Sequence, residues 1–136
     1  MELKVGKKDS ITKNITEKDI IDCADVTGDY NPIHVDEEAA LEAGFKGRIA
    51  HGVLSIGLIS AVLGVKMPGY GTILLEQNIK YRMPVYIGDT ITAECEITEA
   101  INEAKHIYRV NTRCLNQKKE TVMDGYAVIK YSEPNK

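Results

Sequence analysis

The chain has 136 residues and a mass of 15.1 kDa, which is the size of one ordinary domain. Hydrophobic residues make up 43% and charged residues 27%, a balance typical of a soluble globular protein. The net charge of −3 at pH 7 argues against a general nucleic-acid binder, since such proteins usually carry a basic excess. We therefore expect residues 1–136 to form a single domain without a nucleic-acid partner.

The three cysteines, Cys23, Cys95 and Cys114, are an odd number without CxxC spacing. They fit neither a disulfide framework nor a zinc site, and they suit a reducing compartment. The N-terminal run MELKVGKKDS contains no apolar stretch of a secretory signal. The longest apolar run, residues 52–65, is interrupted by serines and is too short to cross a bilayer. We expect a cytoplasmic protein with no metal and no membrane association.

Two short helices are predicted in the first half of the chain. Thr16, with Asp19 three residues later, resembles a capping box, and the helix that it begins should stop at Gly28. Asp36 can cap a second helix from Glu37 to Ala43. Between these helices lies the densest group of polar side chains in the chain.

That group, DYNPIH, places the carboxylate of Asp29 five residues before the imidazole of His34. Pro32 removes a backbone donor and restricts Asn31, so we expect a stiff bend and no regular helix. Asn31 can fix this turn through its own side chain. A carboxylate beside an imidazole is the basic equipment for acid–base catalysis near neutral pH. Ordinary turn chemistry with a structural histidine explains the same residues, and spacing alone leaves both interpretations open.

The third predicted helix, Val53 to Val65, is apolar on nearly all sides, so we expect it to be buried on most of its surface. Gly52 lies at its start, where the first N–H groups have no partner within the helix and the partial charge is positive. A thioester carbonyl that approaches this glycine closely could be stabilised there as an oxyanion. A packing role explains Gly52 equally well.

Four strands are predicted in the second half of the chain, from alternating apolar and polar residues or from runs of strand-forming residues. They are residues 72–82, 90–98, 106–114 and 121–131. Turn signals separate them at 84–89, 99–103 and 116–120. Short connections imply antiparallel pairing of consecutive strands, so we expect a meander.

One buried helix followed by an antiparallel sheet indicates an α+β protein in which the sheet wraps around the helix. Such a sheet has open edges and an outer face that must meet water or a partner. Pairing of two copies at an edge solves this problem economically. We therefore expect a homodimer or a higher homo-oligomer.

The run GDYNPIHVD from Gly28, followed by RIAHGVLSIGLIS from Arg48, resembles the MaoC-like (R)-specific enoyl-CoA hydratases. The family pattern G-D-x-N-P-[LIV]-H-x-D is matched without a departure. The resemblance extends through PGYGTILLEQNIKYRMPVYIGDTI and covers the chain from about Ile15 to Tyr131. It implies the hot-dog fold, an antiparallel sheet wrapped around a long central helix, and a dimer whose reaction requires no cofactor.

The resemblance also implies roles for individual residues. Asp29 and His34 match the family's catalytic pair: Asp29 takes a proton from water as it attacks Cβ, and His34 supplies the proton to Cα. These two roles could be reversed or shared, because an interacting pair titrates as a unit. The Gly52 N–H matches the group that polarises the thioester carbonyl. The other matched positions are Asn31 and Ser60, expected near the substrate, and His51, expected to shape the helix entrance.

The predicted activity is (R)-specific hydration of trans-2-enoyl-CoA to (R)-3-hydroxyacyl-CoA, or the reverse dehydration. An acyl-carrier-protein thioester is an alternative substrate, and a non-catalytic subunit that binds acyl thioesters is an alternative of another class. A hot-dog thioesterase is disfavoured because residues 52–65 contain no carboxylate. Acyl-chain length and pathway are left open.

Basic residues recur on the predicted strands, with Lys80 and Arg82 on one strand face and Arg109 and Arg113 on another. Any of them could meet the phosphates of coenzyme A. A solvated sheet face is the simpler explanation. The sequence therefore assigns no phosphate-binding residue.

Overall fold

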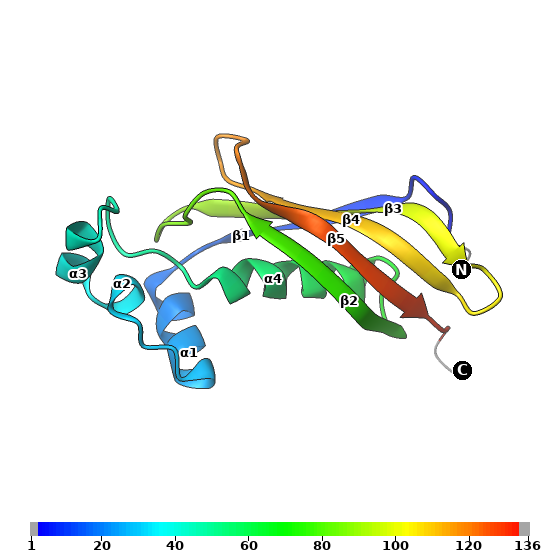
Figure 1. Ribbon diagram of the computed structural model, residues 1–136, viewed down its shortest axis with the longest axis horizontal. Coiled ribbons are helices and arrows are strands. Elements are labelled where there is room, and N and C mark those ends of the chain that lie inside the picture. Colours follow the sequence, from blue (N-terminus) through cyan, green and yellow to red (C-terminus); the bar gives the residue numbers. More distant parts are fainter. Residues whose placement is uncertain (1–2, 134–136) are drawn as a thin grey trace.

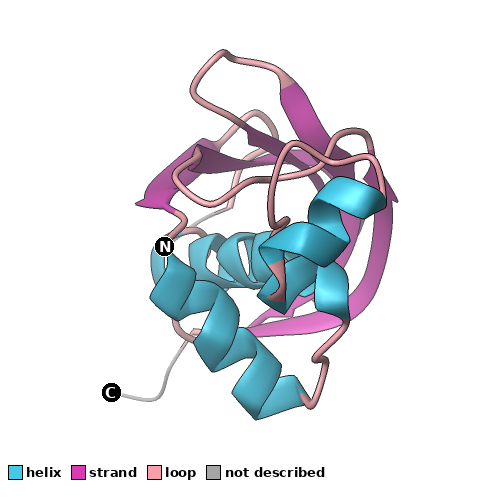
Figure 2. Cartoon of the chain, turned by 90° about the vertical axis from the view of Figure 1, so that its left-hand side faces the viewer, coloured by secondary structure: helices cyan, strands magenta, loops and turns pink. Residues whose placement is uncertain are grey.

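The computed structural model describes residues 3–133, and its centre is a five-stranded antiparallel sheet in the order β1-β3-β4-β5-β2. The strands are β1 (Lys8–Asn14), β2 (Thr72–Tyr81), β3 (Thr90–Asn102), β4 (Ile107–Leu115) and β5 (Thr121–Tyr131). The sheet curves around helix α4 (Gly52–Ala61), which lies against its inner face (Figures 1 and 2). This is the predicted α+β hot-dog architecture.

The core lies between α4 and the inner face of the sheet. The buried residues of the two central strands are Ile91, Ala93, Cys95 and Ile97 on β3 and Tyr108, Val110, Thr112 and Cys114 on β4. The register places the two sets opposite one another, so that Ile97, for example, pairs with Val110. The alternation predicted for 90–98 and 106–114 is therefore confirmed, because successive side chains of a strand point to opposite faces.

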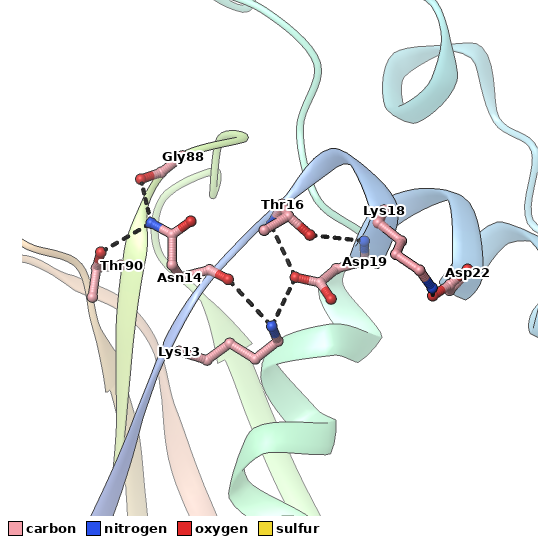
Figure 3. Close-up of polar contacts among 8 residues, drawn as sticks. All are labelled: Lys13, Asn14, Thr16, Lys18, Asp19, Asp22, Gly88 and Thr90. Atoms are coloured by element: carbon pink, nitrogen blue, oxygen red, sulfur yellow. Dashed lines mark hydrogen bonds and ion pairs between the residues drawn. The ribbon is translucent and has the colours of Figure 1, made fainter.

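Three short helices gather at one end of the molecule, beyond the start of α4: α1 (Glu17–Thr27), α2 (Pro32–Val35) and α3 (Glu37–Glu42) (Figure 1). The predicted capping box begins α1, since the Asp19 N–H donates to the Thr16 hydroxyl at 3.1 Å and the Thr16 N–H donates to the Asp19 carboxylate at 2.9 Å (Figure 3). Lys13 binds the same carboxylate at 3.0 Å, which ties the end of β1 to α1. Gly28 ends α1 in the left-handed conformation, as predicted.

Helix α4 differs from the predicted helix in two ways. After Ala61 the chain continues as a π-helical turn, Val62–Lys66, and Val53, Gly57 and Ser60 are exposed. The expectation of burial on most sides is thus wrong for a single chain: these positions, spaced i, i+4 and i+7, form one stripe that the sheet does not cover. Within residues 3–133, no helix has the length and apolarity needed to cross a membrane.

The predicted meander is correct only for β3, β4 and β5. Strand β2 pairs with β5 instead of β3, and β3 pairs with β1. The turn at 84–89 therefore does not close a hairpin. Strand β1 was not predicted, because its sequence KDSITKN is mostly polar and it lies at an exposed edge.

The predicted turn at 99–103 is also misplaced, because β3 runs on to Asn102. The register between β3 and β4 shifts twice near this end, between Ile97 and Glu99 and between Ala100 and Asn102. Each irregularity interrupts the apolar–polar alternation by inserting an extra residue. The strand continues where its sequence pattern stops.

Candidate active site

Helix α2 is a single turn that carries His34, and Asp29 lies in the loop just before it. Pro32 is its first residue, a position where the missing N–H would have no helical partner, so the expectation of no helix here is wrong. Asn31 is the N-cap: its side chain accepts from the Ile33 N–H at 3.3 Å, and its own N–H donates to Oδ1 of Asp29 at 3.1 Å. The predicted fixing of the turn by Asn31 is thus confirmed. The turn holds Asp29 close to His34.

His34 and Asp29 face each other, with 3.9 Å between Nε2 and Oδ2. Nδ1 of His34 lies 2.7 Å from the carbonyl oxygen of Ile49, which can only accept, so Nδ1 carries the proton and Nε2 is directed at the carboxylate. Two groups at this separation can both reach one water oxygen at about 2.8 Å. His34 is buried and the Asp29 side chain is half exposed, so the pair lies at the boundary between interior and solvent.

The segment that precedes α4 braces α2. Nε of Arg48 donates to the carbonyl oxygen of His34 at 2.8 Å, and its Nη1 binds Glu17 of α1 at 2.7 Å. The Ile49 N–H donates to the Ile33 carbonyl at 3.1 Å. These contacts join residues far apart in the chain, so no sequence pattern identified Arg48 or Ile49 as supports of the pair.

His51 is buried against the pair, with 2% of its surface exposed. Its Nε2 donates to the carbonyl oxygen of Asp29 at 2.9 Å, and its ring stacks on His34 with 3.9 Å between centroids. Its Nδ1 has no hydrogen-bond partner in the described part of the chain. The sequence placed His51 only at the helix entrance, but it contacts both members of the pair.

Gly52 is the first residue of α4, and the side chain of His51 does not cap this helix end. The Gly52 N–H therefore has no partner within the helix. A Cβ on Gly52 would lie 2.6 Å from the Tyr81 hydroxyl oxygen, so any side chain here would displace Tyr81. Partial desolvation of the Tyr81 hydroxyl raises the pKa of the phenol, although the residue as a whole is 56% exposed, so it stays protonated at neutral pH. Tyr81 was not predicted, because only the fold brings β2 to the start of α4.

These groups border a cavity of about 430 Å³. Its polar lining consists of His34, His51, Gly52, Ser55, Tyr81 and Arg82. Its apolar lining consists of Phe45, Ile49, Ala50, Met83, Pro84, Val85 and Val122. Asp29 is not among the lining residues, but it faces His34, which is one of them. A mainly apolar hollow with a few convergent polar groups is typical of a small-molecule site.

Two residues predicted near the substrate do not line this cavity. Asn31 is exposed, and its polar atoms serve the turn that it caps. Ser60 lies on the exposed stripe of α4, whereas Ser55 of the same helix is buried and lines the cavity. The sequence could not choose between the two serines, because a helix that is apolar on nearly all sides does not reveal which side faces a cavity.

Asp29, His34 and His51 offer possible metal-ligand atoms within 4.8 Å of one another. A zinc ion would need to lie about 2.0–2.1 Å from each ring nitrogen, along its in-plane lone pair. The two imidazoles are stacked with 27° between their planes, so a point between them lies outside both planes. The arrangement suits proton transfer better than metal binding.

Comparisons with known proteins agree with this geometry. A family model described as a MaoC like domain matches residues 3–119. An (R)-specific enoyl-CoA hydratase of Rhodospirillum rubrum is 43% identical over 128 residues, 94% of this chain and 88% of that protein. A 3-hydroxybutyryl-CoA dehydratase of Methylorubrum extorquens is 40% identical over 129 residues, 95% of this chain and 81% of that protein. The solved structure of an unliganded R-hydratase of Pseudomonas aeruginosa has a TM-score of 0.91 and 43% identity, covering 98% of this chain and 84% of that one.

Proposed function

The chain belongs to the MaoC-like domain family, and we propose that it adds water to trans-2-enoyl-CoA to give (R)-3-hydroxyacyl-CoA, a reaction that also runs in reverse. Its relatives are hydratases and dehydratases, so the protein is an enzyme of the hydro-lyase class. The observation that carries the proposal is the Asp29 carboxylate 3.9 Å from Nε2 of His34, beside the uncapped start of α4.

In the proposed reaction the pair acts on a single water. Asp29 takes one proton from the water while the water oxygen bonds to Cβ and the Cα–Cβ π bond breaks. The imidazolium of His34 gives its Nε2 proton to Cα. The proton on Asp29 then returns to His34, so the net change is OH at Cβ and H at Cα. The Nδ1 contact with Ile49 supports this route, because it leaves Nε2 as the nitrogen that exchanges protons.

Negative charge develops on the thioester during the proposed reaction. As water attacks Cβ, electron density moves onto the carbonyl oxygen to form an enolate. We place this oxygen at the Gly52 N–H, which lines the cavity and begins a helix whose N-terminus favours negative charge. One such donor is typically worth a factor of about 10²–10³ in rate.

We also infer that two copies of this domain assemble. Strand β2 is an edge of the sheet, and its Ile73, Leu74 and Leu75 are 56%, 44% and 52% exposed. The uncovered stripe of α4 adds Val53 to the exposed apolar surface. An exposed hydrophobic edge strand is normally covered in a native protein. A second copy pairing along β2 would cover it and extend the sheet.

The proposed location is the cytoplasm. All three cysteines are free and buried. Burial raises the pKa of Cys95 and of Cys114 to about 12, so both thiols stay protonated. Free thiols of this kind suit a reducing compartment.

The test of the proposed function is hydration of crotonyl-CoA, followed by loss of the enoyl-thioester absorbance. A stereospecific 3-hydroxyacyl-CoA dehydrogenase then reads the chirality of the product. The proposal predicts turnover to the (R)-alcohol. An (S)-product, or no turnover with crotonyl-, hexenoyl- and octenoyl-CoA, would overturn it.

A further inference from the structure

Arg82 lies where two hollows of the molecule meet. It follows directly after β2 and is the one Lys or Arg among the described residues that line the candidate-site cavity. The same residue also lines a groove of about 890 Å³ on the sheet surface, bordered by charged side chains of all five strands. A ligand that extends out of the cavity past Arg82 can enter this groove.

The charges beside Arg82 are not balanced. Oδ1 of Asp124 contacts both Nε and Nη2 of Arg82, at 3.2 and 3.1 Å. Asp124 is also the cross-strand neighbour of Lys80, which lines the same groove. Within residues 3–133, however, Lys80 forms no ion pair. Asp124 thus has two cations beside it, Arg82 in an ion pair and Lys80 without one, in a chain whose net charge is −3.

This local excess has the sign and the place to meet the distant phosphates of the substrate. Building on the proposed function, we propose that Lys80 and Arg82 bind the diphosphate of the CoA thioester where it leaves the cavity. Asp124 holds the guanidinium through Nε and Nη2, which leaves Nη1 as a charged donor for the ligand. Lys80, two residues earlier on the same strand face, adds a compact second charge.

The other arginines of the groove lie away from the candidate-site cavity, although Arg113 is ion-paired much as Arg82 is. Arg113 is paired with Glu94, and the guanidinium of Arg109 lies 4.0 Å from the ring centre of Tyr126. Neither arginine lines the candidate-site cavity. A solvated sheet face accounts for both, whereas Arg82 borders the cavity as well as the groove.

The test compares three crotonyl thioesters that differ only beyond the pantetheine arm. Crotonyl-pantetheine carries no phosphate, crotonyl-4′-phosphopantetheine carries one, and crotonyl-CoA carries the diphosphate. KM and kcat are measured for the wild type, Arg82→Met, Arg82→Lys, Lys80→Met and the control Arg113→Met. The control removes an ion-paired arginine from the same groove without touching the cavity.

We expect Arg82→Met to raise KM for crotonyl-CoA about tenfold, the loss of one charge-assisted contact, with kcat within about twofold. Lys80→Met raises this KM by a smaller factor, and Arg82→Lys retains part of the wild-type affinity. KM and kcat for crotonyl-pantetheine should be the same in every variant as in the wild type. Arg113→Met behaves as wild type with all three thioesters.

Three results would overturn the assignment. KM for crotonyl-CoA could be unchanged in Arg82→Met, or KM for crotonyl-pantetheine could rise by the same factor, which would indicate altered cavity shape. An equal loss with 4′-phosphopantetheine and CoA would assign the contact to the single phosphate that carrier proteins also present. If the wild type hydrates none of the three thioesters, the proposed function itself is contradicted. Failure of the phosphate assignment and failure of the proposed function are therefore distinguishable.

Discussion

His51 connects the two members of the candidate pair without offering a proton of its own to the substrate. Its Nε2–H is committed to the main chain of Asp29, and its ring supports the imidazole of His34. Supporting contacts of this kind around a reactive group are typically worth 10- to 100-fold in activity, by analogy with metal sites where about this range is measured. We therefore treat His51 as a positioning residue.

Replacing His51 by Phe keeps a flat ring against His34 and removes the hydrogen bond to Asp29. We expect kcat for crotonyl-CoA to fall about tenfold or more, with KM changed by less than about threefold. The melting temperature should not fall in parallel, because the substitution also removes a buried Nδ1 that has no partner in the described structure.

The matched control is His106→Asn, which removes an exposed imidazole from the turn between β3 and β4. Asn tolerates the positive φ of 57° at that position. The control should retain wild-type kcat. If His51→Phe also retains it, or loses activity only in proportion to lost folded protein, His51 does not position the pair.

At the scale of elements, the one-turn helix α2 depends on its cap. Asn31 is exposed and directed at the turn, so its side chain should matter through capping and not through contact with substrate. Asn31→Asp preserves a capping oxygen and should keep stability and kcat near wild type. Asn31→Ala removes the capping oxygen and should lower the free energy of unfolding by about 1 kcal/mol, measured by urea denaturation. It should also lower kcat, because the turn that holds Asp29 close to His34 is weakened. A large loss of activity in Asn31→Asp with normal stability would instead indicate contact with the substrate.

Local signals predicted the elements better than their pairing. The capping box at Thr16 and the alternation of β3 and β4 act between near neighbours, and the structure confirms both. The pairing of β2 with β5 is decided by how the sheet closes over α4, which no local pattern encodes. Pro32 misled because proline breaks a helix interior but is well tolerated at the first position.

The same distinction applies to the candidate site. Asp29, His34 and Gly52 belong to two compact motifs that the sequence displays, and the fold brings these motifs together. Tyr81 comes from β2 and Arg48 reaches back to α1, so their parts in the site depend on contacts across the fold. Residues recruited by long-range packing leave no periodic signal in the chain.

At the scale of the whole molecule, the exposed apolar surface of β2 favours assembly with a second copy of the chain. We expect light scattering after gel filtration to give about twice the 15.1 kDa mass of one chain. The double substitution Ile73→Lys with Leu75→Lys places charge on the edge strand and should shift the population toward single chains. Val26→Lys is the control, since Val26 is 86% exposed on α1, away from the sheet edge. A wild-type protein that runs as a single chain at all concentrations would refute the assembly.

The proposed mechanism requires the Asp29 carboxylate to take the proton from water at this site. Asn in its place keeps an oxygen for the Asn31 N–H and preserves the shape of the turn, but it cannot accept the proton. The most direct measurement is kcat of Asp29→Asn for crotonyl-CoA, alongside calorimetric binding of (R)-3-hydroxybutyryl-CoA. We expect kcat to fall by a factor of about 10²–10⁴ while Kd stays within a few-fold of wild type. Hydration within about tenfold of the wild-type rate would show that Asp29 is not the base and would contradict the proposed mechanism.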